Sequence, residues 1–151
     1  MAGHAPKLEI DASDLAVTIL VTSWHTEITD ALLAGAERSL KGAGNDVYSI
    51  VRVPGAFELP LAAKWAAEDD ADVIIALGVV IQGETPHFEY VCNAATDGLT
   101  RVQLDYGVPI GFGLLTVDNA QQALDRAGLP ESKEDKGAEA VEAAVMMARL
   151  R

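Results

Sequence analysis

The sequence is poor in aromatic residues, cysteine and basic side chains. Aromatic residues make up 5% of its 151 residues while 50% are hydrophobic, so Ala, Val, Leu and Ile must build the interior. Its one cysteine, Cys92, excludes a disulfide framework and is expected to be a small buried hydrophobe. Eleven basic residues stand against 23 acidic ones, a net charge of -12. This balance argues against nucleic acid and anionic membranes as partners, because both bind basic patches.

Several functional signatures are also missing. No apolar run approaches the ~20 residues that span a bilayer, and the N-terminus lacks a signal peptide's pattern, so we expect a cytoplasmic protein. The three histidines form no metal-ligand pattern. Neither a Walker loop nor a Gly-x-Gly-x-x-Gly motif follows the first predicted strand, and no Ser or Cys sits in a nucleophile elbow. We therefore expect no metal, and the signatures of mononucleotide and dinucleotide binding are absent.

Hydrophobic periodicity predicts four strands, each followed by a helix. The strands are expected over 15–21, 46–53, 73–81 and 109–116. We expect Thr26, Thr85, and Asp118 or Asn119 to cap the first, third and fourth helices, with Pro86 at the first position of the third. The fourth helix is expected to run through residue 126. The inward face of the last helix is predicted to be Ala138, Val141, Val145 and Ala148.

This order predicts a three-layer, flavodoxin-like α/β domain, with a four-stranded parallel sheet and helices on both faces. Residues 15–151 are long enough for one such domain with a single core. Residues 1–14 are polar and irregular, and are either a disordered tail or an arm that docks elsewhere.

Unusual residues follow three of the predicted strands. Trp24 and His25 come after the first strand, Phe57 and Glu58 after the second, and Gly83 to His87 after the third. Because the carboxyl ends of parallel strands share one edge of the sheet, we expect these segments to converge there. Trp24 either offers a flat face to a planar ring or is a half-buried rim residue.

The turn before the third helix indicates an anion site. Free N–H groups and the helix dipole favour anions there, and His87 beside them can carry a proton near neutral pH. The alternative is a solvated or capping histidine. Arg126 and Lys136 bracket the last loop, as anion ligands or as ordinary surface charges. The spacing alone fits a phosphorylated substrate that reacts with a planar heterocycle.

The sequence resembles the lumazine synthase family from Val17 to Leu150. The matching motifs are Ser23-Trp24-His25-x-x-Ile28-Thr29, Val53-Pro54-Gly55-Ala56-Phe57-Glu58-Leu59-Pro60, residues 76–91 (ALGVVIxGxTxHFxYV), residues 109–116 (PIxFGxLT), Asp125-Arg126-Ala127-Gly128 and Lys136-Gly137. The resemblance implies the cofactor-free condensation of 5-amino-6-(D-ribitylamino)uracil with 3,4-dihydroxy-2-butanone 4-phosphate. The products are 6,7-dimethyl-8-ribityllumazine, phosphate and water.

The resemblance also implies roles for individual residues. His87 would transfer protons and Trp24 would stack on the pyrimidine. The other implied substrate-binding residues are His25; Ala56, Phe57 and Glu58 for the ribityl chain; Val79, Val80 and Ile81 for the ring edge; Gly83, Glu84 and Thr85 for the phosphate; and Phe112, Arg126 and Lys136 from a neighbouring subunit. Arg126 would contact the phosphate.

The family builds its active sites between the subunits of a homopentamer, and its N-terminal arm adds to a neighbour's sheet. Here the connection 128–136 is longer than in shell-forming members and carries three carboxylates, so we expect a free pentamer rather than a sixty-subunit shell. The family more often has Phe-Asn at Trp24-His25 and Asn at Asp135, and Glu84 places a carboxylate beside the phosphate turn. Two alternatives are an archaeal-type riboflavin synthase and a non-catalytic flavin-binding or shell protein of the same fold.

Overall fold

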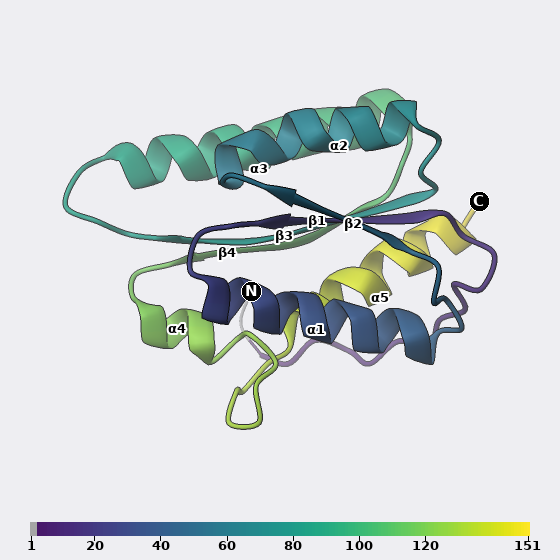
Figure 1. Ribbon diagram of the computed structural model, residues 1–151, viewed down its shortest axis with the longest axis horizontal. Coiled ribbons are helices and arrows are strands. Elements are labelled where there is room, and N and C mark those ends of the chain that lie inside the picture. Colours follow the sequence, from purple (N-terminus) through teal and green to yellow (C-terminus); the bar gives the residue numbers. More distant parts are fainter. Residues whose placement is uncertain (1–2) are drawn as a thin grey trace.

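A computed structural model describes residues 3–151, so the first two residues of the predicted arm lie outside it. Figure 1 shows three layers: α2 and α3 cover one face of the sheet, and α1, α4 and α5 cover the other. The elements are β1 (Val17–Thr22), α1 (Thr26–Gly42), β2 (Ser49–Val53), a short 3-10 turn η1 (Ala56–Glu58), α2 (Leu59–Glu68), β3 (Val73–Ile81), α3 (His87–Tyr106), β4 (Ile110–Val117), α4 (Ala120–Leu124) and α5 (Lys136–Arg149).

The four strands form one parallel sheet in the order β2-β1-β3-β4, which confirms the predicted fold class. The centre of the sheet is β3, whose first seven residues are buried, and its bounds are those predicted from the unbroken apolar run. The edge strand β2 begins at Ser49, three residues later than expected. The side chain of Asn45 binds the carbonyls of Ala12 and Leu15 and accepts from the Val47 N–H, so the chain turns before β2 begins.

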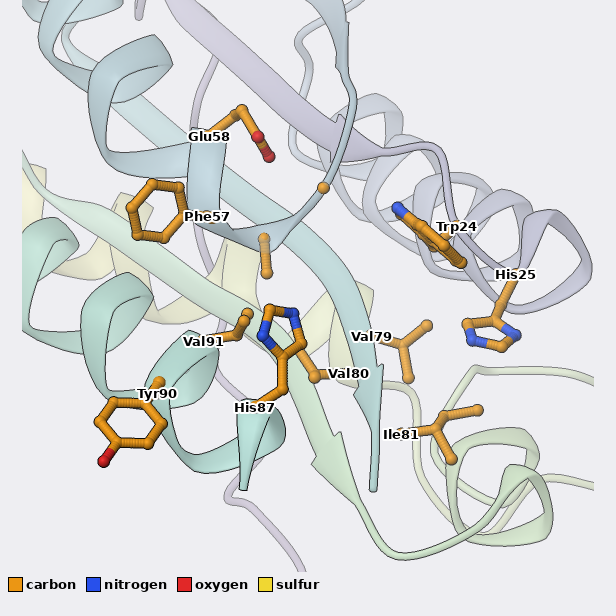
Figure 2. Close-up of a pocket in the computed structure, with 12 residues that line it drawn as sticks. Trp24, His25, Phe57, Glu58, Val79, Val80, Ile81, His87, Tyr90 and Val91 are labelled. Atoms are coloured by element: carbon orange, nitrogen blue, oxygen red, sulfur yellow. The ribbon is translucent and has the colours of Figure 1, made fainter. Parts of the chain in front are cut away.

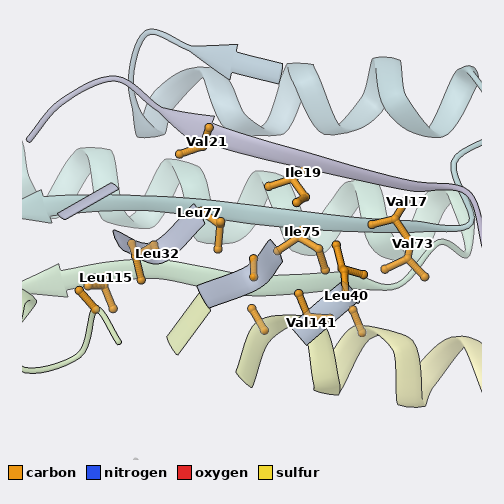
Figure 3. Packing of buried hydrophobic residues seen from close by; sticks show 14 of the residues in the cluster. Val17, Ile19, Val21, Leu32, Leu40, Val73, Ile75, Leu77, Leu115 and Val141 are labelled. Atoms are coloured by element: carbon orange, nitrogen blue, oxygen red, sulfur yellow. The ribbon is translucent and has the colours of Figure 1, made fainter. Parts of the chain in front are cut away.

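Aliphatic side chains fill the space on both sides of the sheet. Figure 3 shows the side that faces α1 and α5, where Ile75, Leu77 and Val141 are fully buried. On the other side, Ile74 and Leu59 pack with the helices α2 and α3. All eight aromatic residues lie within 3–151 and none of them is buried, as the composition predicted.

Two of the predicted helix caps are wrong. Thr26 is the first residue of α1, and His25 precedes it in the left-handed conformation with φ 55° and no side-chain cap. At α3, Pro86 takes the cap position instead of Thr85, and helical geometry begins at His87. Asn119 does cap α4, because its side chain accepts from the Gln122 N–H at 3.0 Å. That helix ends at Leu124 rather than at 126, where the chain tightens into a turn.

The inward face of α5 is broader than predicted. Ala138 and Ala148 are only half-buried, whereas the smaller Gly137 is buried together with Ala140, Val141, Ala144 and Val145. Helical period alone missed this because α5 packs on α1 as well as on the sheet. A Cβ atom at Gly137 would lie 2.1 Å from the Leu32 carbonyl oxygen, so only glycine permits this close approach of the two helices.

The base of the N-terminal arm packs on its own chain. The N–H of Ala12 donates to the Ala43 carbonyl at 2.9 Å, and Arg149 Nε donates to the Asp11 carbonyl at 2.8 Å. Residues 3–7 are exposed. Addition of the arm to a neighbour's sheet therefore stays a prediction. Within the described residues, every helix is too short or too polar to cross a membrane.

Candidate active site

A pocket of about 570 Å³ opens at the carboxyl edge of the sheet (Figure 2). The segments that follow β1 and β2, the end of β3 and the first turns of α3 contribute its walls. The lining residues are Trp24, His25, Gly55, Ala56, Phe57, Glu58, Val79, Val80, Ile81, His87, Tyr90 and Val91. The predicted convergence of three strand ends is thereby confirmed.

Trp24 and His25 form one wall of the pocket. Their ring centroids are 6.4 Å apart with the planes tilted by 45°, so the two rings do not stack on each other. The Trp24 side chain is 67% exposed, which leaves its indole face available to a ligand. Ser23 fixes this end of β1, because its hydroxyl donates to the Val53 carbonyl at 2.8 Å.

Gly55 brings the indole and a carboxylate close together. A Cβ atom at this position would lie 3.3 Å from Glu58 Oε2 and 3.5 Å from Trp24 Nε1. The η1 turn, in which the Glu58 N–H bonds to the Gly55 carbonyl at 3.2 Å, turns the carboxylate back towards Gly55. The sequence signal for Gly55 is its place before Ala56 in the matched motif, but its closeness to Trp24 and Glu58 is visible only in the folded chain.

The end of β3 extends beyond its neighbour β1. The pairing of these strands ends at Val21 with Leu77, whereas pairing with β4 continues to Ile81 with Val117. Successive residues of a strand direct their backbone groups to opposite neighbours, and in β3 the odd-numbered residues face β1. The backbone N–H and C=O groups of Val79 and Ile81 therefore have no strand partner on the β1 side within the described part of the chain, whereas those of Val80 face β4. Such groups need partners when they are covered, so this edge suits a planar ligand with donors and acceptors along its rim.

His87 opens α3 and is exposed in the free subunit. Figure 2 shows its ring directed into the pocket, on the opposite side from Trp24 and His25. The turn residues Gly83, Glu84 and Thr85 lie between β3 and His87, outside the pocket lining, and all three are exposed. Sequence reasoning did not select Tyr90 and Val91, although their helical spacing of three and four residues from His87 places them beside it.

Arg126 and Lys136 lie away from this pocket, around a common carboxylate. Glu134 Oε2 is 3.8 Å from Arg126 Nε and 3.3 Å from Lys136 Nζ. Lys136 also donates to Glu139 Oε1 at 3.0 Å. Partial burial of the ammonium acts to lower the pKa of Lys136, but the hydrogen bond to Glu139 and the charges of Glu139 and Glu134 outweigh burial and raise it. The Lys136 side chain is therefore cationic at neutral pH.

Thiol and metal chemistry find no support at the described residues. Cys92 is half-buried on α3, and burial raises the pKa of its thiol, which keeps it protonated and unreactive. Among residues 3–151, no group of three or more His, Cys, Asp or Glu side chains could hold a metal ion.

Comparison with known proteins identifies the family. The family model described as 6,7-dimethyl-8-ribityllumazine synthase matches residues 14–151. The chain belongs to this family. The 6,7-dimethyl-8-ribityllumazine synthase of Clavibacter sepedonicus is 57% identical over 154 residues, which cover 99% of this chain and 96% of that protein. The proteins of the same name from Leifsonia xyli subsp. xyli and Kineococcus radiotolerans are 60% and 59% identical, over 92% and 93% of this chain and 87% and 88% of their own lengths.

Of the 15 site residues implied by the resemblance to this family, nine line the pocket and six do not. The six are Gly83, Glu84, Thr85, Phe112, Arg126 and Lys136. The first three adjoin the pocket through His87. Phe112, on β4, is 49% exposed, and it lies outside the pocket lining, as do Arg126 and Lys136. Within a single subunit, the pocket therefore holds only part of the predicted set of residues.

Proposed function

We propose that this protein condenses 5-amino-6-(D-ribitylamino)uracil with 3,4-dihydroxy-2-butanone 4-phosphate to form 6,7-dimethyl-8-ribityllumazine, phosphate and water. It is a transferase of riboflavin biosynthesis, in keeping with the family match over residues 14–151 and relatives at 57–60% identity. The observation that carries the proposal is the pocket that joins an exposed indole, a carboxylate and a helix-start histidine at one sheet edge.

The pyrimidine binds between Trp24 and the free edge of β3. The indole face stacks on the heterocycle, and the backbone of Val79 to Ile81 pairs with the donors and acceptors on its rim. Glu58 accepts hydrogen bonds from the ribityl hydroxyls, helped by Ala56 and Phe57 on the same turn. His25 contributes a polar contact beside Trp24. The unpaired stretch of β3 and the closeness of Glu58 to the indole support this arrangement.

The phosphate binds at the turn that precedes α3. Backbone N–H groups of Gly83, Glu84 and Thr85, with the Thr85 hydroxyl, cradle its oxygens, and the helix dipole favours the negative charge. The Glu84 side chain is exposed, so its carboxylate can point to solvent. His87 then lies beside the carbonyl of the bound butanone and transfers the protons that imine formation and phosphate loss require.

Most of the rate enhancement comes from holding the two substrates together. The amine of one substrate attacks the carbonyl of the other, and water and phosphate leave, so no covalent bond to the enzyme is needed. Fixing two reactants in contact converts a bimolecular step into an effectively unimolecular one, which accelerates it strongly. The proposed reaction therefore requires no nucleophilic side chain of the protein.

The complete site is shared between subunits of a homopentamer. Phe112, Arg126 and Lys136 of one subunit approach the pocket of the next, with Arg126 on the phosphate. Exposed apolar side chains on α2 and α3 support an assembly that covers them: Leu61, Trp65 and Leu104 are 50%, 57% and 75% exposed. The cytoplasm, as the place of this reaction, remains the expectation from the sequence.

A single assay tests the proposed reaction. The purified protein, incubated with both substrates, is expected to produce the fluorescent lumazine and to release an equal amount of phosphate. A riboflavin synthase would instead consume lumazine in the absence of the butanone phosphate. Lack of product at substrate concentrations that saturate the pocket would favour the non-catalytic protein and overturn the proposal.

A further inference from the structure

The carboxylate of Glu134 lies between two cations of the proposed site, Arg126, which is assigned to the phosphate, and Lys136. Its side chain is 18% exposed, and its Oε2 atom is buried without a hydrogen bond, within ion-pair distance of both Lys136 Nζ (3.3 Å) and Arg126 Nε (3.8 Å). A partly buried carboxylate is retained only where opposite charges compensate its lost hydration. Its position therefore depends on Arg126 and Lys136, and theirs on it.

Backbone hydrogen bonds fix Glu134 in this position. The Glu134 N–H donates to the Asp125 carbonyl, and the Gly128 N–H donates to the Glu134 carbonyl, both at 3.0 Å. The N–H of Lys136 donates in turn to the Arg126 carbonyl at 3.0 Å. These bonds close the 125–136 loop on itself, which holds the carboxylate over the side chains that it pairs with.

The contacts of Arg126 leave one edge of its guanidinium available. Nε faces Glu134, and one Nη1 hydrogen is donated to the Gln122 carbonyl at 2.8 Å. A guanidinium has five N–H donors, and the outer Nη edge is the edge that can bind two oxygens of a phosphate at once. Arg126 also lines a hollow of about 240 Å³, together with Gln122, Asp125, Lys133 and Glu134.

We propose that Glu134 is a positioning residue, which holds Arg126 by its Nε edge, together with Lys136, so that the Nη edge is presented to the substrate phosphate. This inference rests on the proposed function, because it concerns the same phosphate. Glu134 does not touch the reacting atoms. The negative charge of Glu134 also repels an anion, but Arg126 and Lys136 both offset that charge, so loss of orientation outweighs loss of repulsion when the carboxylate is removed.

The substitution Glu134→Ala tests the role. Loss of the carboxylate frees the guanidinium, and we expect the KM for the butanone phosphate to rise roughly tenfold while the KM for the pyrimidine changes by less than about twofold. Glu134→Asp, which keeps the charge on a shorter stem, should recover part of the loss. Glu131→Ala is the matched control, because Glu131 is exposed in the same loop and forms no hydrogen bond or ion pair within residues 3–151.

A binding measurement separates this inference from the proposed function. The dissociation constant of inorganic phosphate, measured by calorimetry on the assembled protein, should rise by the same factor in Glu134→Ala. If the wild-type protein makes no lumazine, the proposed function fails. The dissociation constants of phosphate for the wild type and Glu134→Ala still decide the role of Glu134. If the alanine variant does not fold, Glu134→Gln keeps the shape of the side chain without its charge and should raise the dissociation constant of phosphate in the same way. A lower or unchanged phosphate constant, or equal KM increases for both substrates, would overturn the positioning role.

Discussion

The contact between α5 and α1 at Gly137 allows a sharp test of the structure. In Gly137→Ala, the new Cβ would lie 2.1 Å from the Leu32 carbonyl oxygen and 3.2 Å from the Ala36 nitrogen. A carbon and an oxygen need about 3.3 Å, so the two helices must separate by roughly 1 Å. Both obstacles are backbone atoms, which cannot rotate away as a side chain can.

Two opposing effects set the magnitude. Alanine is the better helix former by about 1 kcal/mol, whereas overpacking typically costs about 1–3 kcal/mol. Because backbone must move, the cost lies at the upper end, and we expect a net destabilisation of about 2 kcal/mol. For a chain of this length that corresponds to a fall in Tm of about 4–8 °C.

Thermal unfolding followed by circular dichroism measures the effect. The variants must be compared at equal protein concentration, because association contributes to the apparent stability. Gly42→Ala is the matched control: Gly42 ends α1, and nothing lies within 4 Å of the position that its methyl group would take, so its Tm should equal or exceed that of the wild type. A Gly137→Ala protein as stable as Gly42→Ala would refute the close packing of α1 and α5.

Four further results are expected. His87→Ala should lower kcat roughly 10- to 10⁴-fold with the fold intact, the range for a lost acid–base group, and an unchanged kcat in a steady-state assay would remove its proton-transfer role. Arg126→Ala should raise the KM for the butanone phosphate far more than that for the pyrimidine, and mixing its subunits with inactive His87→Ala subunits should restore activity if sites are shared. Burial, and then the hydrogen bond with Glu37, raise the pKa of Tyr48 from 10.0 to about 12. The stability that this tyrosine contributes is therefore complete below pH 10 and is lost as the pH rises to 12. When Tm is measured across this pH range, Tyr48→Phe should not show that loss. Light scattering should give the mass of a free pentamer at neutral pH, and a mass near sixty subunits would contradict the expectation from the 128–136 connection.

The parts of the fold that were predictable are those that depend on local pattern and topology. The bounds of β3 followed from its unbroken apolar run, since a strand buried on both faces has no polar positions. The convergence of Trp24, Glu58 and His87 followed from the rule that parallel strands end at one edge. Both features were accessible without any knowledge of side-chain packing.

The features that were missed depend on contacts between distant segments. The left-handed conformation of His25 depends on how the chain must turn from β1 into α1, for which glycine or asparagine is the usual signal. The role of Gly55 depends on where Glu58 and Trp24 come to lie. The pairing of Glu134 with Arg126 and Lys136 depends on the folded shape of the 125–136 loop, and a count of charges in the sequence does not reveal it.

The exclusion of aromatic side chains from the core has a spectroscopic consequence. Trp24 and Trp65 are the only tryptophans, and they are 67% and 57% exposed on different parts of the subunit. Intrinsic tryptophan fluorescence therefore carries little information about the packing of the sheet and helices. The emission of Trp24 should respond to a ring bound in the pocket, while that of Trp65 on α2 should respond to whatever covers that helix. In Trp65→Phe, the remaining emission of Trp24 should report ligand binding. In Trp24→Phe, the remaining emission of Trp65 should report subunit association.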